Sequence, residues 1–332
     1  MMKNIRWGII GCGDVTEVKS GPAFQNIEGS ELVAVMRRNG EKAKDYAIRH
    51  GVSTWYDDAD KLIHDSRVDA VYIATPPSSH ADYAIKVLEA GKPVYVEKPM
   101  AMDYAECERM IAASEKAGVP LFVAYYRRRL PVFLKVRELV ESGAIGAVRF
   151  VTVELYQPPE EGEYDPDNLH WHVVPAFSAG GRFVDMGCHQ LDILDDILGP
   201  LDSALGMAHN QARLYPAEDI VCASFRFQSG VLGTGIWCFT VSEKSQRDQI
   251  EIIGSQGSIR FSAFQTAPIN VEAEDSVEEY EYPSPEHVAQ PLIETVVAEL
   301  QGHGTCPSTG VSAARTTLMI DHILADWRRT FS

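Results

Sequence analysis

The sequence predicts an α/β protein in which a doubly wound parallel sheet is followed by an α+β domain with a large open, mainly antiparallel sheet. Short apolar runs alternate with helical patterns up to about residue 124, as in parallel sheets whose crossovers are helices. A glycine-rich turn follows the first of these runs. From Val148 onward, apolar and polar residues alternate along segments joined by short turns, which is typical of an antiparallel sheet with one covered face.

Length and charge divide the chain in two. At 332 residues it is too long for one typical core. The net charge is −17, with −3 in the first 124 residues and −14 in the rest. We therefore expect one domain over residues 1–124 and a second over 125–332. The acidic balance excludes nucleic acid as a partner, because it repels a phosphate backbone.

The sequence also predicts a cytoplasmic protein without a membrane partner. The first apolar run, Ile5–Ile10, contains Arg6 and is too short to span a bilayer. The residues before it lack the features of a secretory signal. The six cysteines form no Cys-x-x-Cys pair and no zinc spacing, so we expect reduced thiols.

The glycine-rich turn predicts a dinucleotide site. After the strand Ile5–Ile10 the chain reads Gly-x-Gly-x-x-Thr from Gly11 to Thr16, the dinucleotide fingerprint with its third glycine replaced. Gly11 permits a tight turn, and Gly13 allows main-chain N–H groups to approach a pyrophosphate at a helix N-terminus. The first domain is therefore expected to be a Rossmann domain.

The residues at the end of the second apolar strand, Leu32–Met36, indicate which dinucleotide binds. An acidic residue there binds a ribose 2′-hydroxyl, whereas arginine suits a 2′-phosphate. This strand is followed by Arg37 and Arg38, and no acid occurs before Glu41. A guanidinium matches a phosphate with two parallel hydrogen bonds, so we expect NADP to be preferred and NAD to remain possible. Two solvated surface arginines are the alternative.

The next buried strand, Val68–Ala74, breaks at Thr75 and Pro76, and the loop reaches His80. Prolines directly after a strand force the backbone away from the sheet. This loop is expected to line the cofactor site, with Thr75 and His80 near ribose or phosphate. Alternatively, His80 only begins the helix Ala81–Ala90 and binds no ligand.

A lysine follows the strand Pro93–Val96. Glu97 and Lys98 come at its carboxyl end, the edge where open α/β sheets bind ligands, and Pro99 restricts the backbone of Lys98. A surface salt bridge between the two residues is the alternative. The residues expected to contact the cofactor are Gly11, Gly13, Asp14, Val15, Arg37, Arg38, Thr75, Pro76, His80, Glu97 and Lys98.

A second candidate cluster lies in the helical pattern from Phe183 to Leu198. Asp185 and His189 are four residues apart, so both point to one side of a helix. A carboxylate beside an imidazole orients it and raises its basicity, as a general base for a hydroxyl requires. A buried core histidine is one alternative. A metal site that includes Asp192 is another, weakened by the single histidine.

Four segments in this order resemble the glucose-fructose oxidoreductase / inositol dehydrogenase / rhizopine-catabolism (Gfo/Idh/MocA) family, over nearly the whole chain. They are Gly11-Cys12-Gly13, Ala74-Thr75-Pro76-Pro77-Ser78-Ser79-His80, Glu97-Lys98-Pro99 and Gly180-Gly181-Arg182-Phe183-Val184-Asp185-Met186-Gly187-Cys188-His189. The resemblance implies NAD(P)-dependent oxidation or reduction at a sugar or polyol carbon. It also implies a homodimer or homotetramer built through the open C-terminal sheet.

The resemblance assigns roles to single residues. Lys98, Asp185 and His189 correspond to the family's catalytic trio, and the peptide before Pro99 is often cis. Arg128 falls where the family often has an arginine, and Tyr126 replaces a frequent asparagine. Both are therefore candidate substrate contacts. Three further candidates come from the loop Gln157–His172, which is expected to shape the substrate entrance: His170, Trp171 and His172.

Two alternatives to a sugar or polyol dehydrogenase stay open at this level. Oxidation of trans-dihydrodiols or other vicinal diols is found in relatives of this family, and aromatic residues near the expected pocket suit such substrates. A non-catalytic NADP-sensing regulator also resembles the family, but a regulator has no need for a lysine together with an Asp/His pair. Turnover of any polyol distinguishes an enzyme from a regulator.

Overall fold

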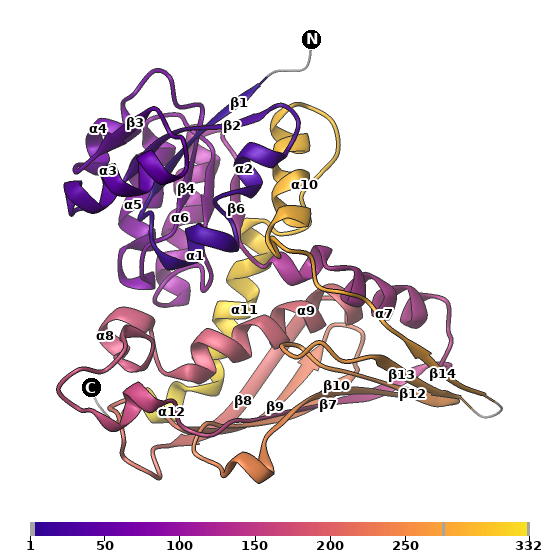
Figure 1. Ribbon diagram of the computed structural model, residues 1–332. Coiled ribbons are helices and arrows are strands. Elements are labelled where there is room, and N and C mark those ends of the chain that lie inside the picture. The colour runs from indigo at the N-terminus through magenta and orange to yellow at the C-terminus, as the bar shows by residue number, and fades with distance from the viewer. Residues whose placement is uncertain (1–3, 274–275, 331–332) are drawn as a thin grey trace. The chain divides into compact units, whose positions relative to one another are not determined.

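The computed structural model describes residues 4–273 and 276–330. The chain forms two compact units, each built on its own sheet (Figure 1). Unit 1 holds the described residues up to Leu130 together with Pro285–Ala314, and unit 2 holds Pro131–Ser284 and the described residues from Arg315 onward. The chain passes between the units three times, and the last crossing falls within the helix α11 (Gly310–Ile323).

Unit 1 contains the predicted doubly wound parallel sheet. Its six strands have the order β3-β2-β1-β4-β5-β6 and all pair in parallel. The strand order reverses between β1 and β4, which fixes the ligand-binding edge of such a sheet. The strands are β1 (Ile5–Ile10), β2 (Ser30–Met36), β3 (Thr54–Tyr56), β4 (Ala70–Ile73), β5 (Val94–Val96) and β6 (Leu121–Val123).

Helices join these strands, and polar residues mark where the helices begin. The side chains of Asn39, Asp58 and Asp103 each accept a main-chain N–H in the first turn of α3, α4 and α6, which satisfies a donor that the helix leaves unpaired. The helices are α1 (Asp14–Val18), α2 (Ala23–Asn26), α3 (Gly40–Arg49), α4 (Ala59–Ile63), α5 (His80–Glu89) and α6 (Tyr104–Ala117), with a 3₁₀ turn, η1, at Pro77–Ser79.

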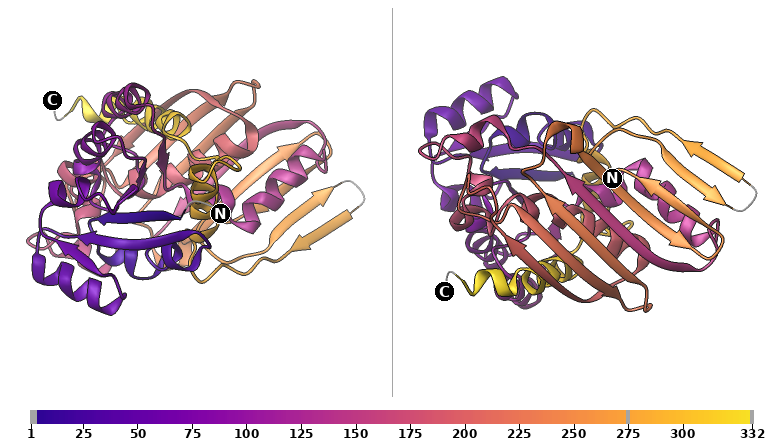
Figure 2. Two further views of the ribbon diagram at one scale, coloured as in Figure 1. Left: turned by 90° about the horizontal axis from the view of Figure 1, so that it is seen from above. Right: turned by 90° about the horizontal axis from the view of Figure 1, so that it is seen from below.

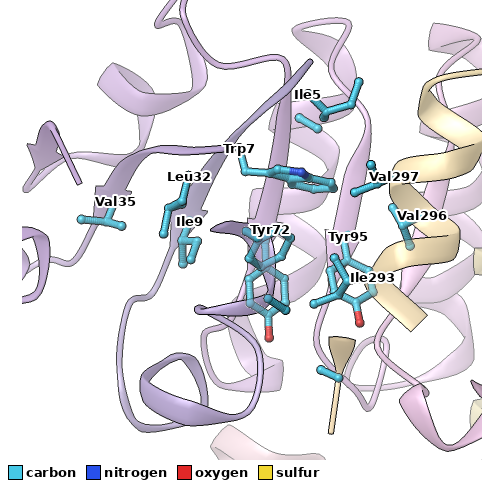
Figure 3. Packing of buried hydrophobic residues seen from close by; sticks show 14 of the residues in the cluster. Ile5, Trp7, Ile9, Leu32, Val35, Tyr72, Tyr95, Ile293, Val296 and Val297 are labelled. Carbon is cyan, nitrogen blue, oxygen red and sulfur yellow. The ribbon is translucent and has the colours of Figure 1, made fainter. Parts of the chain in front are cut away.

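The core of unit 1 includes a helix from near the end of the chain. Trp7, Tyr72 and Tyr95 project from the sheet toward Ile293 and Val296 of α10 (Gln290–Leu300), and all are fully buried (Figure 3). The expected boundary near Ala124 had assigned α10 to the second domain. It packs in unit 1 instead, because its apolar face covers this aromatic surface of the sheet.

Unit 2 contains the predicted open sheet, eight strands in the order β14-β13-β12-β11-β7-β10-β9-β8. Every pair is antiparallel except β7 with β10. The strands are β7 (Val148–Tyr156), β8 (Leu201–His209), β9 (Ile220–Phe227), β10 (Leu232–Cys238), β11 (Arg247–Gly254), β12 (Gly257–Phe261), β13 (Ile269–Ala273) and β14 (Ser276–Tyr280).

Helices of unit 2 cover one face of this sheet. Phe133 of α7 (Pro131–Glu141) packs on Phe261 of β12, and α9 (Cys188–Leu198) contacts β10. The opposite face carries exposed apolar side chains and is seen in the second view of Figure 2. The remaining segments of this unit are η3 (Glu161–Tyr164), η4 (Trp171–Val173), α8 (Pro175–Ser178), η5 (Phe183–Gly187), η6 (Glu243–Ser245) and α12 (Ala325–Arg328).

Within the described part of the chain, each helix is too short or too polar to cross a membrane. The cytoplasmic location expected from the sequence stays a prediction.

Replacing Ile293 with alanine tests the packing of α10 in unit 1. Ile293 is completely buried, so the change leaves a cavity and should lower the free energy of unfolding by about 2–5 kcal/mol. Ile48→Ala, on the exposed side of α3, is the matched control and should change it by about 0.5 kcal/mol or less. Denaturant unfolding measures both. Equal effects of the two substitutions would contradict this packing.

Candidate active site

The carboxyl ends of β1, β4 and β5, three neighbouring strands, meet at one edge of the unit 1 sheet. Gly11 follows β1 with φ of +94°, and a Cβ there would lie 2.7 Å from Thr75 Cγ2 and 2.9 Å from the carbonyl carbon of Ala74. Only glycine fits this position. The loops after β1 and β4 are therefore in direct contact at the point where the strand order reverses.

Thr16, which replaces the third glycine of the fingerprint, closes the turn. Its buried hydroxyl donates to the Gly13 carbonyl at 2.7 Å and accepts the Gly13 N–H at 3.0 Å. A Cβ on Gly13 would have as its nearest described neighbours the Gly11 carbonyl oxygen at 3.8 Å and Arg37 Nη1 at 4.0 Å. The turn thus leaves room for a group close to the backbone, which fits a dinucleotide phosphate.

The two arginines after β2 differ in environment. Arg37 is half-buried and its Nη1 donates to the carbonyl of Cys12 at 3.3 Å, so its guanidinium lies beside the glycine turn. Arg38 is exposed. Asn39 caps α3 with its side chain. One of the two arginines is therefore placed next to the proposed phosphate site.

The loop after β4 is held by His80. This ring is fully buried, with Nε2 2.7 Å from the carbonyl of Thr75 and Nδ1 3.0 Å from the carbonyl of Pro99. Burial lowers the pKa of His80 to about 4. The geometry favours the alternative in which His80 binds no ligand, because both nitrogens face main-chain carbonyls. Thr75 and Pro76 are half-buried beside it.

Glu97 is part of a half-buried hydrogen-bond chain that joins Tyr72 to the backbone of Lys98. Its carboxylate accepts the Tyr72 hydroxyl at 2.5 Å and the main-chain N–H of Lys98 at 3.1 Å. Burial raises its pKa. The Lys98–Pro99 peptide is cis, as the resemblance implied, and the Lys98 side chain is half-buried. Glu97 therefore fixes the backbone from which Lys98 projects.

The two candidates after β6 (Tyr126 and Arg128, in the 3₁₀ turn η2, Tyr126–Arg129) have partners within unit 1. The hydroxyl of half-buried Tyr126 accepts from Arg127 at 3.1 Å, with that guanidinium 4.9 Å from the ring centroid. Arg128 is buried and donates to the carbonyl of Pro307 at 3.1 Å. Substrate contact by Tyr126 and Arg128 stays a prediction.

In unit 2 the expected helix begins with a π-helical turn, η5, before continuing as α9. A Cβ on Gly187 would lie 2.7 Å from the Phe183 ring, which in turn packs edge-on against Trp237 of β10. The Trp237 indole N–H donates to Gln190 at 2.6 Å. The wider turn lets the Phe183 ring pack against both Gly187 and the sheet, and such turns recur at functional sites.

This turn and the start of α9 carry Asp185 and His189. Asp185 is half-buried, and His189 is 4% exposed. The His189 ring meets the Phe264 ring edge-on at 6.1 Å between centroids. Phe264 is held in turn by Asp248, whose carboxylate accepts its N–H at 2.7 Å. The two proposed catalytic groups of this unit are thus one turn apart on a segment fixed by sheet contacts.

The predicted substrate loop is anchored to the same segment by Arg182. This buried guanidinium donates to the carbonyl of Pro158 at 3.0 Å and to the Gln157 side chain, and it pairs with Glu163 at 3.6 Å. Farther along the loop, three ring side chains contact one another, with centroids 3.8–5.8 Å apart: His170, Trp171 and His172. Their contact with substrate stays a prediction.

Several residues of the site were not predicted from the sequence. Tyr72 and Trp237 read as ordinary core residues, although each bonds a neighbour of a proposed catalytic residue. Arg182 lies inside a segment that carried the resemblance, so its position was a usable signal. Glu218, which accepts the Gly181 N–H at 2.8 Å, was not singled out.

Comparison with known proteins finds a family model for the sheet region of each unit. Residues 5–125 match the oxidoreductase family with an NAD-binding Rossmann fold, and residues 133–260 match the GFO/IDH/MocA C-terminal domain. Oxidoreductase P35 of Formosa agariphila is 40% identical over 97% of this chain and 98% of its own. The 1,5-anhydro-D-fructose reductase of Ensifer adhaerens is 27% identical over 92% and 91%.

A solved structure extends the likeness to the fold. The WlbA dehydrogenase of Bordetella pertussis, in complex with NADH and UDP-GlcNAcA, superposes with a TM-score of 0.82 at 26% identity, over 99% of this chain and 98% of that one. The family predicted from the four sequence segments is confirmed: this chain is an oxidoreductase of the Gfo/Idh/MocA family.

Proposed function

We propose that this enzyme transfers hydride between a nicotinamide cofactor and a hydroxyl or carbonyl carbon of a sugar, polyol or related cyclic substrate. The observation that carries the proposal is the edge of unit 1 at which the glycine turn, Thr75 and Lys98 follow three neighbouring strands. Relatives named for a sugar derivative, such as 1,5-anhydro-D-fructose reductase, support the substrate class. Vicinal diols remain the second candidate.

The proposed chemistry assigns one task to each residue of the trio. When bound, the cofactor accepts a hydride from the substrate carbon or supplies one. In oxidation His189 takes the hydroxyl proton while the C–O bond becomes a carbonyl. In reduction it returns the proton to the oxygen. Lys98 donates a hydrogen bond to that same oxygen and stabilises its developing negative charge. Asp185 orients His189.

The preferred cofactor is proposed to be NADP. Its diphosphate would lie at the Gly11–Asp14 turn, near the N–H groups of Asp14 and Val15, and the 2′-phosphate would be bound by Arg37 and Arg38. The support is geometric, because Arg37 lies beside the turn and the first acid after the strand, Glu41, is exposed at the start of α3. The relative from Bordetella pertussis was solved with NADH.

A panel of sugars, polyols and vicinal diols, each assayed with NAD⁺ and NADP⁺, tests the function and the cofactor together. We expect turnover of at least one cyclic polyol or sugar, with the higher kcat/KM for NADP⁺. Arg37→Ala should raise the KM for NADP⁺ about 10- to 100-fold, as expected for loss of a charged hydrogen bond, and leave that for NAD⁺ nearly unchanged.

Lys44→Ala is the matched control for this cofactor test. Lys44 is an exposed cation on α3, so its loss changes net charge without removing a contact at the turn. A preference for NAD⁺ in the unaltered enzyme would refute the role given to Arg37 and Arg38. Absence of turnover across the panel would refute the substrate class.

His189→Ala tests the general base. Loss of an acid–base group typically lowers turnover about 10²- to 10⁴-fold. Binding of NADPH, followed by fluorescence titration, should stay as in the unaltered enzyme, because the proposed cofactor contacts all belong to unit 1. His303→Ala removes an exposed histidine of unit 1 and should leave both quantities unchanged. Normal turnover of the His189 variant would remove this residue from the mechanism.

We also propose that two copies associate through the open face of the unit 2 sheet. This face carries a cluster of exposed apolar side chains, and a shallow hollow lies among them. Contiguous apolar surface of this kind marks protein interfaces, and a second copy offers a self-complementary partner. The apolar cluster consists of Phe150, Leu205, Met207, Leu232 and Ile236.

Leu205→Lys combined with Met207→Lys tests this interface. The two side chains are 71% and 75% exposed, so lysines are tolerated in a single copy but place like charges opposite each other in a symmetric pair. We expect the molar mass measured by light scattering to fall to that of one chain. Ile48→Lys, on α3, is the control. An unchanged molar mass for the double variant would exclude this face as the interface.

A further inference from the structure

A buried carboxylate of unit 2 lies against the two glycines that precede the π-helical turn. Glu218, two residues before β9, is 1% exposed. Its Oε1 accepts the main-chain N–H of Gly181 at 2.8 Å. The same oxygen would be only 3.1 Å and 3.3 Å from a Cβ on Gly180 and on Gly181, respectively. The glycines thus make the space that this carboxyl group occupies.

The contact continues from Glu218 to Asp185 through a single residue. The N–H of Gly181 is bound by Glu218, and the carbonyl of Gly181 accepts the N–H of Asp185 at 3.3 Å. The residue before the glycines, Ala179, has φ of +69°, and its carbonyl accepts from Arg328 at 3.0 Å. A displaced Gly181 therefore moves the first hydrogen bond of the turn that leads to His189.

We propose that Glu218 is a positioning residue, which holds Gly181 and through it sets where Asp185 and His189 lie. The inference rests on the function proposed above, in that Asp185 and His189 matter to turnover. Glu218 itself touches no reacting group in this scheme. Its effect on the reaction is indirect, since it fixes the start of the segment that carries them.

The neighbouring acid shows that this role is specific to Glu218. Asp219 is equally buried, yet its two carboxylate oxygens accept the N–H groups of Gln211 and Ala212 at 2.8 Å and 2.7 Å. It therefore holds the loop between β8 and β9. Two adjacent acids of the same burial thus serve different segments, which supplies a matched control.

Glu218 is also expected to couple the turn to pH. Burial raises the pKa of Glu218 to about 7; the Arg328 guanidinium of α12 favours its ionisation, and the adjacent Asp219 opposes it. Tyr215, on the loop before β9, lies in the field of Glu218 and of three further charged residues, Glu163, Arg182 and Asp219.

The sign of the stability effect follows from that raised pKa. The folded protein holds the Glu218 proton more tightly than the unfolded chain, whose carboxyl has the ordinary value of 4.5. The stabilisation is therefore complete below about pH 4.5 and is lost as pH rises through about 7. Glu218→Gln keeps an acceptor for Gly181 and removes the titration.

The experiment compares Glu218→Gln, Glu218→Ala and Asp219→Asn in the full chain. We expect Glu218→Ala to lower kcat about 10- to 100-fold through misplacement of the base, with the Kd for NADPH unchanged. Glu218→Gln should restore kcat to within about 3-fold, because it keeps the hydrogen bond. Its stability relative to the unaltered protein should rise with pH between about 4.5 and 7, the window set by the Glu218 pKa. Asp219→Asn should retain kcat.

Hydrogen exchange of the amides of Gly181 and Asp185 gives a readout that needs no substrate. Faster exchange in Glu218→Ala, but not in Glu218→Gln, supports the proposal. Unchanged exchange and unchanged kcat in Glu218→Ala would overturn it, as would an equal loss of kcat in Asp219→Asn. If the unaltered protein turns over no substrate, the proposed function fails, and exchange alone still decides whether Glu218 holds the turn.

Discussion

The close approach of two loops at Gly11 is the constraint on which the cofactor edge of unit 1 depends. The chain leaves β1 with a positive φ and passes so near Ala74 and Thr75 that a side chain at Gly11 would overlap them. Because β1 and β4 are neighbours at the point where the strand order reverses, this contact joins the glycine turn to the loop after β4. The next strand, β5, then places Lys98 at the same edge.

Unit 2 uses a related arrangement for its proposed catalytic pair. Side chains approach the main chain closely at Gly181 and Gly187, where Glu218 and Phe183 occupy the space that a side chain on the glycine would fill. Contacts with β10 through Trp237 hold the far end of the same turn. Asp185 and His189 are therefore carried by a segment whose start is bound by Glu218 and whose far end packs on the sheet, as a site that must keep its geometry requires.

Sequence patterns predicted the strands and turns whose structure depends on residues close together in the chain. Strands buried on both faces give continuous apolar runs such as Leu32–Met36, and a fixed turn chemistry marks Gly11. The π-helical turn was missed because Phe183 and the leucines after it follow an ordinary helical period. The wider form of the turn depends on packing against Trp237 of β10, which is far away in sequence. The place of α10 in unit 1 likewise depends on Trp7 and Tyr95, far away in sequence.

Two buried acids show why composition alone conceals such roles. Glu97 and Glu218 each accept a main-chain N–H, one from Lys98 and one from the residue that bonds Asp185, and burial raises the pKa of both. Exposed pairs such as Arg49 with Glu17 add little stability, because solvent screens them. A buried acceptor is different, since its loss leaves an N–H unsatisfied at a cost of about 1–3 kcal/mol. In this acidic chain, two carboxyl groups beside the proposed catalytic residues therefore act by holding the backbone in place.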